Sequence, residues 1–320
     1  MNRIVRLEDL AQLTPSSDTV LAIGVFDGVH LGHQYLLRLT AERARQLGCL
    51  SGAITFHPHP RQVLMPENGP GYLLSLEERL ELISEQGIEL IVTLSFTREL
   101  AMVPAADFMA GVKAYLRLRE LFVGANFALG RGREGTPERL VRLGQDMGFA
   151  VQVVQPLEID GVAVSSTAIR QALQEGEVEL AARLMGRAVT ISGKVIPGRA
   201  RGQLLGFPTA NLCFDPERVV PAFGVYAVRV WLDDQVCSGV ANLGVRPTFD
   251  SGEPCLEVHL MDFQADLYGR VMRVEFVRRL RPEIRFATPA DLVAQIRRDI
   301  EQAREVLGAT AGCTRFGSKP

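Results

Sequence analysis

The stretch Gly24–His33, with the sequence GVFDGVHLGH, joins a strand-like pattern to a helix-like pattern. Residues 20–26 form an apolar run bounded by Asp27 and Gly28, which predicts a strand. Residues 33–47 have helical periodicity and end at Gly48. At the start of a helix the first backbone N–H groups lack partners and the dipole is positive, so such a turn attracts phosphate. The stretch therefore predicts an α/β fold with an anion site at a strand end.

The same alternation continues through the first half of the chain. Further strands are predicted at 50–56, 88–94, 120–123 and 150–155, and further helices at 75–87, 104–118 and 136–147. The first of these helices opens with a capping box, Ser75 to Glu78. Repeated strand–helix units imply a parallel sheet with helices on both faces, and ligands of such folds bind beyond the carboxyl ends of the strands.

The pattern changes near Gly186. Short alternating segments at 189–196, 209–214, 225–232, 237–243, 256–263 and 271–277 predict antiparallel strands. Six such strands suit a small β-barrel, and a single helix capped by Thr288 and ended by Gly308 follows them. We therefore expect two domains, residues 1–185 and residues 186–308, followed by a disordered tail at 309–320.

Composition narrows the class of protein. Hydrophobic residues make up 47% and charged residues 22% of the 320 residues, which is typical of a soluble globular protein. The 35 basic and 37 acidic side chains are not segregated into a basic stripe, so no nucleic-acid partner is expected. No apolar run is long enough to span a membrane, and charges interrupt the first ten residues, so we expect a cytoplasmic location.

The five cysteines lie far apart, with no C-x-x-C spacing: Cys49, Cys213, Cys237, Cys255 and Cys313. This spacing favours neither a zinc cluster nor a redox pair. We expect reduced, mostly buried thiols.

Four of the five histidines fall at two predicted strand ends. His30 and His33 are three residues apart at the helix start, and His57 and His59 flank Pro58 after the next strand. This spacing aims the first pair at the phosphates bound there. A zinc site is the alternative, although no cysteine lies nearby and H-x-x-H lacks the i, i+4 spacing of a helical zinc pair.

These motifs also carry a family resemblance. GVFDGVHLGHQ resembles the H-x-G-H motif of nucleotidyltransferases, and with TFHPHP (residues 55–60) and VSSTAIR (residues 164–170) it resembles the bacterial bifunctional riboflavin kinase/FMN adenylyltransferase family. The resemblance implies a Rossmann-like nucleotidyltransferase domain, with His30 and His33 catalytic and with His57, Pro58 and Asn126 on the flavin. It assigns ATP and phosphate binding to Gly24, Phe26, Asp27, Gly32, His33, Ser165, Ser166, Thr167 and Arg170. The last four also have a physical logic, since three hydroxyls at a helix start and an arginine one turn on suit a phosphate.

The second half supports the resemblance independently. The Gly-rich segment 198–206 leads into Phe207-Pro-Thr-Ala-Asn211, which resembles the phosphate loop and P-T-A-N motif of the family, and segments 241–249 and 256–269 also match its kinase half. No G-x-x-x-x-G-K-[ST] occurs, so a kinase here has another fold. By resemblance, Glu257 is the general base and Thr209 and Asn211 hold Mg²⁺. Gly198, Gly206, Pro208, Thr209 and Asn211 bind ATP or its phosphates.

The resemblance implies that riboflavin and ATP give FMN in the second domain, and that FMN and ATP give FAD and pyrophosphate in the first. Gln203, Asn126 and Leu129 stand where the family often carries Arg, Asp and Phe. The absence of Arg at Gln203 puts one ATP contact of the kinase in doubt, whereas Asn126 can still form a hydrogen bond to a ligand. Two alternatives remain: a single-activity adenylyltransferase or cytidylyltransferase with a regulatory barrel, and a flavin or nucleotide sensor without activity. The sequence makes no prediction about protein partners, the oligomeric state, the redox state of the flavin substrate or the direct transfer of FMN between sites.

Overall fold

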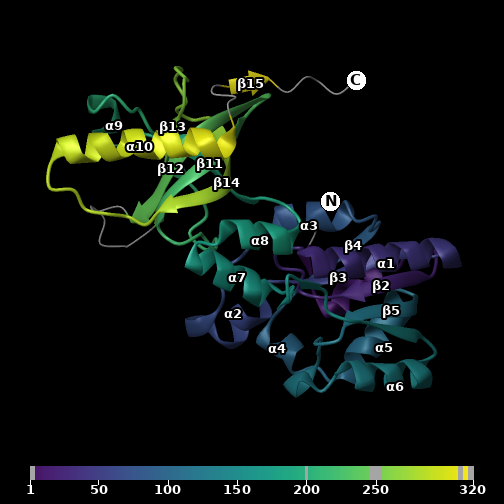
Figure 1. Ribbon diagram of the computed structural model, residues 1–320. Coiled ribbons are helices and arrows are strands. Elements are labelled where there is room, and N and C mark those ends of the chain that lie inside the picture. The colour runs from purple at the N-terminus through teal and green to yellow at the C-terminus, as the bar shows by residue number, and fades with distance from the viewer. Residues whose placement is uncertain (1–3, 199–200, 246–253, 309–312, 316–320) are drawn as a thin grey trace. The chain divides into compact units, whose positions relative to one another are not determined.

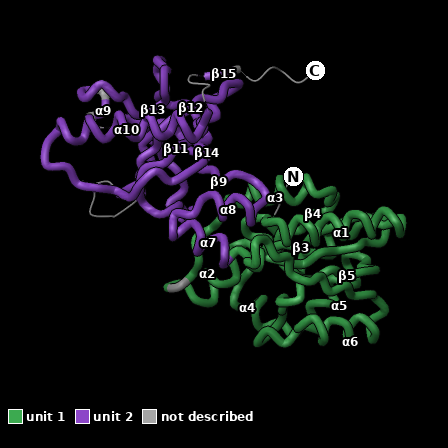
Figure 2. Tube along the Cα trace, in the orientation of Figure 1, with its two compact units in different colours: residues 1–166 green, residues 167–320 purple. Residues whose placement is uncertain are grey.

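The structure is a computed structural model that describes residues 4–198, 201–245, 254–308 and 313–315 (Figure 1). The chain divides into two compact units, residues 1–166 and 167–320 (Figure 2).

Unit 1 is built on a parallel sheet. Its strands are β1 (Ile4–Val5), β2 (Thr19–Ile23), β3 (Leu50–His57), β4 (Leu90–Ser95), β5 (Leu118–Gly124) and β6 (Ala150–Val154). They lie in the order β1-β4-β3-β2-β5-β6, and every neighbouring pair is parallel. A short hairpin of β7 (Glu158–Ile159) and β8 (Val162–Ala163) follows the sheet. The order places β2 and β3, whose ends carry the histidine pairs, side by side in the sheet.

Helices connect these strands. The α-helices are α1 (Leu31–Leu47), α2 (Pro60–Leu64), α3 (Leu76–Ser84), α4 (Arg98–Ala101), α5 (Ala105–Tyr115) and α6 (Pro137–Met147). Short 3₁₀ segments are η1 (Leu7–Leu13), η2 (Pro66–Asn68) and η3 (Arg131–Arg133). The predicted capping box is present at α3, where Ser75 Oγ accepts from the N–H of Glu78 and the Glu78 carboxylate accepts from the N–H of Ser75.

Both faces of the sheet are covered, as the alternation in β2 shows. Leu21 and Ile23 belong to a buried cluster with side chains of α5 and α6, whereas Val20 and Ala22 belong to a second cluster with side chains of α1. Figure 1 shows α5 and α6 on one side of the sheet and α1 on the other. The predicted doubly covered parallel sheet is therefore confirmed.

Unit 2 is a closed antiparallel barrel with helices. Its strands are β9 (Val189–Ile196), β10 (Ala210–Cys213), β11 (Gly224–Leu232), β12 (Gln235–Val245), β13 (Pro254–Leu260) and β14 (Val271–Arg281). They pair in the order β9-β10-β13-β12-β11-β14, and β14 returns to β9. Each predicted barrel segment coincides with one of these strands, so the six-stranded barrel is confirmed.

The helices of unit 2 are α7 (Ser166–Glu175, whose first residue belongs to unit 1), α8 (Val178–Met185), α9 (Arg201–Leu204) and α10 (Pro289–Leu307). Thr288 caps α10 by accepting from the N–H of Asp291, and the helix ends before Gly308, as predicted. α10 packs on β11 and β12, with Ala303 and Leu307 in a buried cluster with Ala227.

α7 and α8 are held by the barrel. The N–H of Ala222 donates to the carbonyl oxygen of Leu173 over 2.7 Å, and Arg278 of β14 pairs with Glu179 of α8 over 2.9 Å. These contacts place the division between compact units at residues 166 and 167, ahead of the change in sequence pattern at Gly186. Helical periodicity alone does not say which unit a helix packs against, so the boundary of the sequence pattern and that of the compact units differ.

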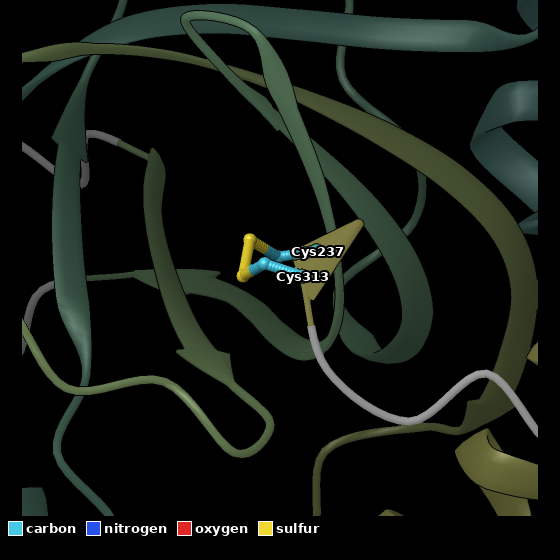
Figure 3. The surroundings of a disulfide bond; sticks show 2 residues. All are labelled: Cys237 and Cys313. Carbon is cyan, nitrogen blue, oxygen red and sulfur yellow. A yellow bond between two sulfur atoms is a disulfide. The ribbon is translucent and has the colours of Figure 1, made fainter. Parts of the chain in front are cut away.

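One disulfide corrects two expectations. Cys237 of β12 and Cys313 are bonded to each other (Figure 3), so these two cysteines are not reduced thiols. Cys313 belongs to the strand β15 (Cys313–Arg315), which pairs with residues 235–237 of β12. The expected disorder of the tail is therefore wrong for residues 313–315, and the rest of the tail lies outside the described residues. Among the described residues, Cys49, Cys213 and Cys255 are not part of a disulfide; Cys255 is buried and Cys213 is exposed.

Candidate active sites

The turn between β2 and α1 has an unusual backbone. Gly28 has φ of +81°, and Phe26 and Val29 have φ of 52° and 33° although they carry side chains. Phe26 and Val29 are fully buried, so packing holds them in this conformation. At Gly24 a Cβ would lie 2.9 Å from the Phe26 ring, so the turn also needs a small residue there. The turn has a defined shape ahead of any ligand.

The first histidine pair lies at the start of α1. His30 is the N-cap, and its Nδ1 accepts the backbone N–H of His33 over 3.3 Å. The two rings are stacked, with centroids 3.6 Å apart, and the Phe26 ring meets His33 edge-on at 5.3 Å. At Gly32 a Cβ would lie 3.2 Å from the His30 ring. The structure therefore brings together His30, His33, Gly32 and Phe26, as the sequence predicts.

Two side chains fix the carbonyl group of Val25, just before the strained residues. Thr55 Oγ1 of β3 and Nη1 of Arg79 of α3 donate to that oxygen over 2.9 Å and 3.0 Å. Arg79 is 1% exposed, and its Nε and Nη2 have no hydrogen-bond partner among the described residues. Burial lowers the pKa of Arg79, while the charges of Asp27 and Tyr72 oppose that shift. The sequence analysis missed Arg79 because its position depends on how α3 packs.

Asp27 and Ser166 tie the turn to its surroundings. The buried carboxylate of Asp27 accepts the N–H of Leu73 over 3.1 Å. Ser166 Oγ donates to the backbone oxygen of Asp27 over 2.8 Å, which links the first residue of α7 to the turn. Thus two residues predicted to bind phosphate also support the turn from opposite ends of unit 1's sequence. Ser165 directly precedes α7, whereas Thr167 and Arg170 belong to unit 2.

The second histidine pair lies at the end of β3. His57 is the last residue of that strand, the His57–Pro58 peptide bond is cis, and His59 caps α2 by accepting the N–H of Arg61 over 3.0 Å. Tyr72 stacks on His57 at 5.7 Å between ring centroids, and its hydroxyl accepts the N–H of His59. Both histidine pairs thus lie at the carboxyl edge of neighbouring parallel strands.

The two departures after β5 have different surroundings. Asn126 is exposed in the loop after β5, where its amide is accessible to a ligand. Leu129 is buried in the core cluster that contains α5 and α6. The Leu129 side chain therefore serves packing in this chain.

Two adjoining cavities lie in unit 2, and they share Thr209. One, of about 380 Å³, is lined by Gly198, Pro208, Thr209, Asn211 and residues 263–268. The other, of about 340 Å³, contains Glu257 and lies between the barrel strands and the apolar side chains Leu292, Ile296 and Ile300 of α10. Two ligands, one in each cavity, would therefore come together beside Thr209.

Strand register aligns the polar side chains of these cavities. Asn211 of β10 lies opposite Glu257 of β13, and Glu257 lies opposite Asn242 of β12. Residues paired in this way point to the same face of a sheet. The sequence analysis names Asn211 and Glu257 as candidates but not Asn242, for which the alternation of polar and apolar residues over 237–243 was the available signal.

The Gly-rich segment approaches Asn211 closely. At Gly198 a Cβ would lie 2.1 Å from the Asn211 amide nitrogen, so any larger residue there would displace the Asn211 side chain. Gly206 has φ of +85°. Residues 199–200 of this segment and residues 246–249 of the ANLGVRPTF segment lie outside the described residues, as does the side chain of Gln203.

An ion pair closes one wall of the 340 Å³ cavity. Arg281, the last residue of β14, contacts the Asp299 carboxylate through Nε and Nη2 at 2.8–3.1 Å, and Gln295 donates to the same carboxylate. Asp299 is fully buried on α10. The pair therefore anchors α10 to the barrel beside the cavity.

A third cavity, of about 950 Å³, lies in unit 1 beside η1, α4 and α5, and none of the predicted site residues lines it. Within the described ranges, no group of three or more His, Cys, Asp and Glu side chains has the arrangement of a metal site. Across the same ranges, no helix combines the length and apolar character that a membrane crossing requires.

Comparison with known proteins extends over nearly the whole chain. The FAD synthetase family model matches residues 13–168, and the riboflavin kinase family model matches residues 185–307. The bifunctional riboflavin kinase/FMN adenylyltransferase of Escherichia coli K12 is 39% identical over 312 residues, which cover 97% of this chain and 99% of that protein. The same-named protein of Pseudomonas fluorescens is 40% identical over 294 residues, which cover 91% of this chain and 94% of that protein. A solved structure described as a macrolide-efflux protein from Streptococcus pneumoniae superposes with a TM-score of 0.84 at 32% identity, covering 92% of this chain and 96% of that one.

Proposed function

This chain belongs to the family of bifunctional riboflavin kinases/FMN adenylyltransferases, and from that premise we propose which residues carry each of its two reactions. The chain phosphorylates riboflavin to FMN with ATP and adenylylates FMN to FAD with release of pyrophosphate. We assign adenylylation to residues 1–185 and phosphorylation to residues 186–308. The family matches support this order, since FAD synthetase matches first and riboflavin kinase second.

The observation that carries the kinase assignment is the pair of cavities that share Thr209. A phosphoryl transfer needs two substrates whose reacting ends meet in line. The apolar cavity under α10 suits the flavin ring, and the cavity that contains Gly198 and Asn211 suits ATP. With this placement, the γ-phosphate and the flavin 5′-hydroxyl meet beside Thr209.

Glu257 is placed to act as the base of the kinase. It lies in the flavin cavity, opposite Asn211 in the strand register and therefore next to the ATP cavity. The 5′-hydroxyl is a poor nucleophile at neutral pH, and a carboxylate within hydrogen-bond reach accepts its proton as the bond to phosphorus forms. Asn242, on the other side of Glu257 in the register, is placed to orient the same hydroxyl group.

Thr209 and Asn211 fit the requirements of Mg²⁺. Both offer neutral oxygen atoms, which suit this hard cation when phosphates supply the remaining ligands. The Asn211 side chain is buried, and its Oδ1 accepts a weak hydrogen bond from the Cys255 thiol at 3.8 Å, which fixes the amide in place. When bound, Mg²⁺ neutralises charge on the ATP phosphates.

Adenylylation requires different equipment because the nucleophile is already a phosphate anion. No base is needed, and catalysis consists of holding two anions in line and stabilising charge at the α-phosphate. We assign the stabilisation of this charge to the N-terminus of α1 and to the His33 ring. His30 caps the helix and stacks on His33. We assign His57, Pro58 and Asn126 to the flavin. On the family resemblance we also propose that Ser165, Ser166, Thr167 and Arg170 bind phosphate.

Two parallel incubations test the assignment. Purified protein is supplied with ATP and Mg²⁺ and with either riboflavin or FMN, and the products are separated by chromatography. FAD from both flavins is the expected result. FAD from FMN alone would support the single-activity alternative, and no product would support the sensor.

We do not extend to this chain the efflux activity named for the Streptococcus pneumoniae structure, because the family matches and the two cavities support flavin chemistry.

The cytoplasmic location stays a prediction. So does the assignment of the histidines to phosphate and not to zinc. The zinc alternative is tested by chelator dialysis: addition of Mg²⁺ alone restores full activity if the histidines bind phosphate. Zinc retained at one equivalent and required for turnover would reverse that assignment.

A further inference from the structure

His259 is the histidine that stands apart from the two pairs, and it lies in the kinase half. It follows Glu257 by two residues on β13, so both side chains project from the same face of the strand. Both line the 340 Å³ cavity, whereas the intervening Val258 and the following Leu260 line the other cavity. His259 is therefore a polar side chain in the cavity assigned to the flavin, one strand step beyond the proposed base.

A backbone carbonyl group fixes the hydrogen-bonding state of the ring. Nδ1 of His259 is 2.9 Å from the carbonyl oxygen of Pro208. A carbonyl oxygen only accepts, so Nδ1 carries the hydrogen atom, and in the neutral ring Nε2 is then an acceptor. The Phe207 ring meets the His259 ring edge-on at 5.9 Å and limits its rotation. Pro208 and Phe207 thus hold the ring with a defined tautomer.

The other side chains that line the cavity suggest which part of the flavin the His259 acceptor would meet. Most of its side chains are apolar, among them Val225, Val240 and Ile296, and these suit the flavin ring. The polyol chain of riboflavin carries three secondary hydroxyl groups besides the 5′-hydroxyl, and each requires a partner when it leaves water. The polar side chains of the cavity are placed to meet that chain.

We propose that Nε2 of His259 accepts a hydrogen bond from a secondary hydroxyl group of the flavin's polyol chain and so sets the kinase's specificity for hydroxylated flavins. The inference rests on the proposed function, because it needs the flavin in this cavity. The bond from Nδ1 to Pro208 orients the ring, and the same bond restrains the residue that precedes Thr209. Loss of the acceptor leaves a buried hydroxyl group without a partner, whereas loss of the hydroxyl group leaves the acceptor without one.

Two substitutions separate the two ring nitrogens. In His259→Asn the amide nitrogen occupies the place of Nδ1 and keeps the bond to Pro208, but the acceptor at Nε2 is gone. In His259→Gln the longer amide reaches the place of Nε2 and restores an acceptor there. Each variant is assayed with riboflavin and with analogues that lack one secondary hydroxyl group.

We expect His259→Asn to raise KM for riboflavin about tenfold, the scale of one hydrogen bond to a buried group, with kcat and the KM for ATP changed less than about threefold. His259→Gln recovers part of the loss. For one deoxy analogue, wild type and His259→Asn have the same KM, because the interaction is already absent. If the loss in His259→Asn is the same with riboflavin and with every analogue, the proposal is wrong. A raised KM for ATP with unchanged KM for riboflavin also contradicts it.

A control on the cavity keeps this failure distinct from failure of the proposed function. Ile296 lines the same cavity from α10, and Ile296→Trp fills it. If the folded Ile296→Trp protein binds riboflavin normally, the flavin lies elsewhere and the proposed function is wrong at that point. If Ile296→Trp raises KM while His259→Asn shows no dependence on the polyol hydroxyl groups, only the inference about His259 fails. FAD formation from supplied FMN is expected to be unchanged in all three variants.

Discussion

Arg79 is a single buried residue that supports the turn of the proposed adenylylation site. Its guanidinium group is buried beside Asp27 and donates to the backbone oxygen of Val25, the residue before the strained Phe26. Thr55 donates to the same oxygen from the neighbouring strand. Because a buried charge is costly unless it is compensated, the nearby Asp27 carboxylate contributes to keeping Arg79 charged. The histidine turn is therefore held in part by Arg79 and Thr55, which are not among its proposed ligand-binding residues.

Removal of this support is predicted to loosen the turn. We expect Arg79→Met to lower the free energy of unfolding of the N-terminal unit by roughly 1–3 kcal/mol, the scale of a lost charged hydrogen bond, and to slow FAD formation from FMN. Arg79→Lys keeps the charge but not the planar fork, and we expect an intermediate effect. Urea denaturation and FAD assays measure both. Wild-type stability together with a wild-type rate in Arg79→Met would contradict this role.

His33 is predicted to matter for chemistry rather than for folding. Its ring stacks on His30 at the start of α1, where we propose that charge on the phosphates is stabilised during adenylylation. We expect His33→Ala to lower the rate of FAD formation from FMN by about 10²–10³, the scale of one lost transition-state donor. Riboflavin phosphorylation in the same sample serves as the internal control. An unchanged rate of FAD formation in the folded variant would remove His33 from the mechanism.

At the scale of elements, the sequence predicts the strands and helices whose signals lie in adjacent residues. The sheet strands from β2 to β6, the barrel strands from β9 to β14 and the cap of α10 follow from alternation and capping signals in adjacent residues. β1 has only two residues, too few for a pattern. The Cys237–Cys313 bond joins residues 76 positions apart, so only the fold brings them together. The histidine pairs were predictable from strand ends, whereas Arg79, Asn242 and His259 depend on packing and register.

A residue of β11, Tyr226, is predicted to make the free energy of unfolding depend on pH in the alkaline range. Tyr226 is fully buried on β11 and donates to the carbonyl oxygen of Ala222, and burial raises its pKa from 10.0 to about 12. Above pH 10 the unfolded state loses this proton while the folded state keeps it. The stabilisation is therefore complete below pH 10 and is lost as the pH rises towards 12.

Tyr226→Phe tests this point. The variant lacks the titrating group, so its unfolding free energy should fall less steeply between pH 9 and pH 11 than that of the wild type. Urea denaturation across this range, followed by the fluorescence of Trp231 in unit 2, measures both slopes. Equal slopes in the two proteins would show that Tyr226 does not titrate differently on folding.

At the scale of the whole molecule, we propose that the two reactions use separate sets of residues. The histidine turn lies within residues 1–166, and the two cavities with Thr209, Asn211 and Glu257 lie within residues 167–320. Each set has its own elements for phosphate: the start of α1 in one and the segment around Gly198 and Thr209 in the other. FMN is the product of one set and the substrate of the other. The account therefore requires that either reaction can be removed by mutation while the other continues.

Glu257→Gln tests that central claim most directly. The substitution keeps the size and hydrogen bonding of the side chain but removes the base, so riboflavin phosphorylation should fall by about 10²–10⁴. FAD formation from supplied FMN should stay at the wild-type rate in the same preparation. If Glu257→Gln instead abolishes both reactions in a folded protein with FMN in excess, the two sites are shared or tightly coupled, and the assignment of one reaction to each half of the chain is wrong.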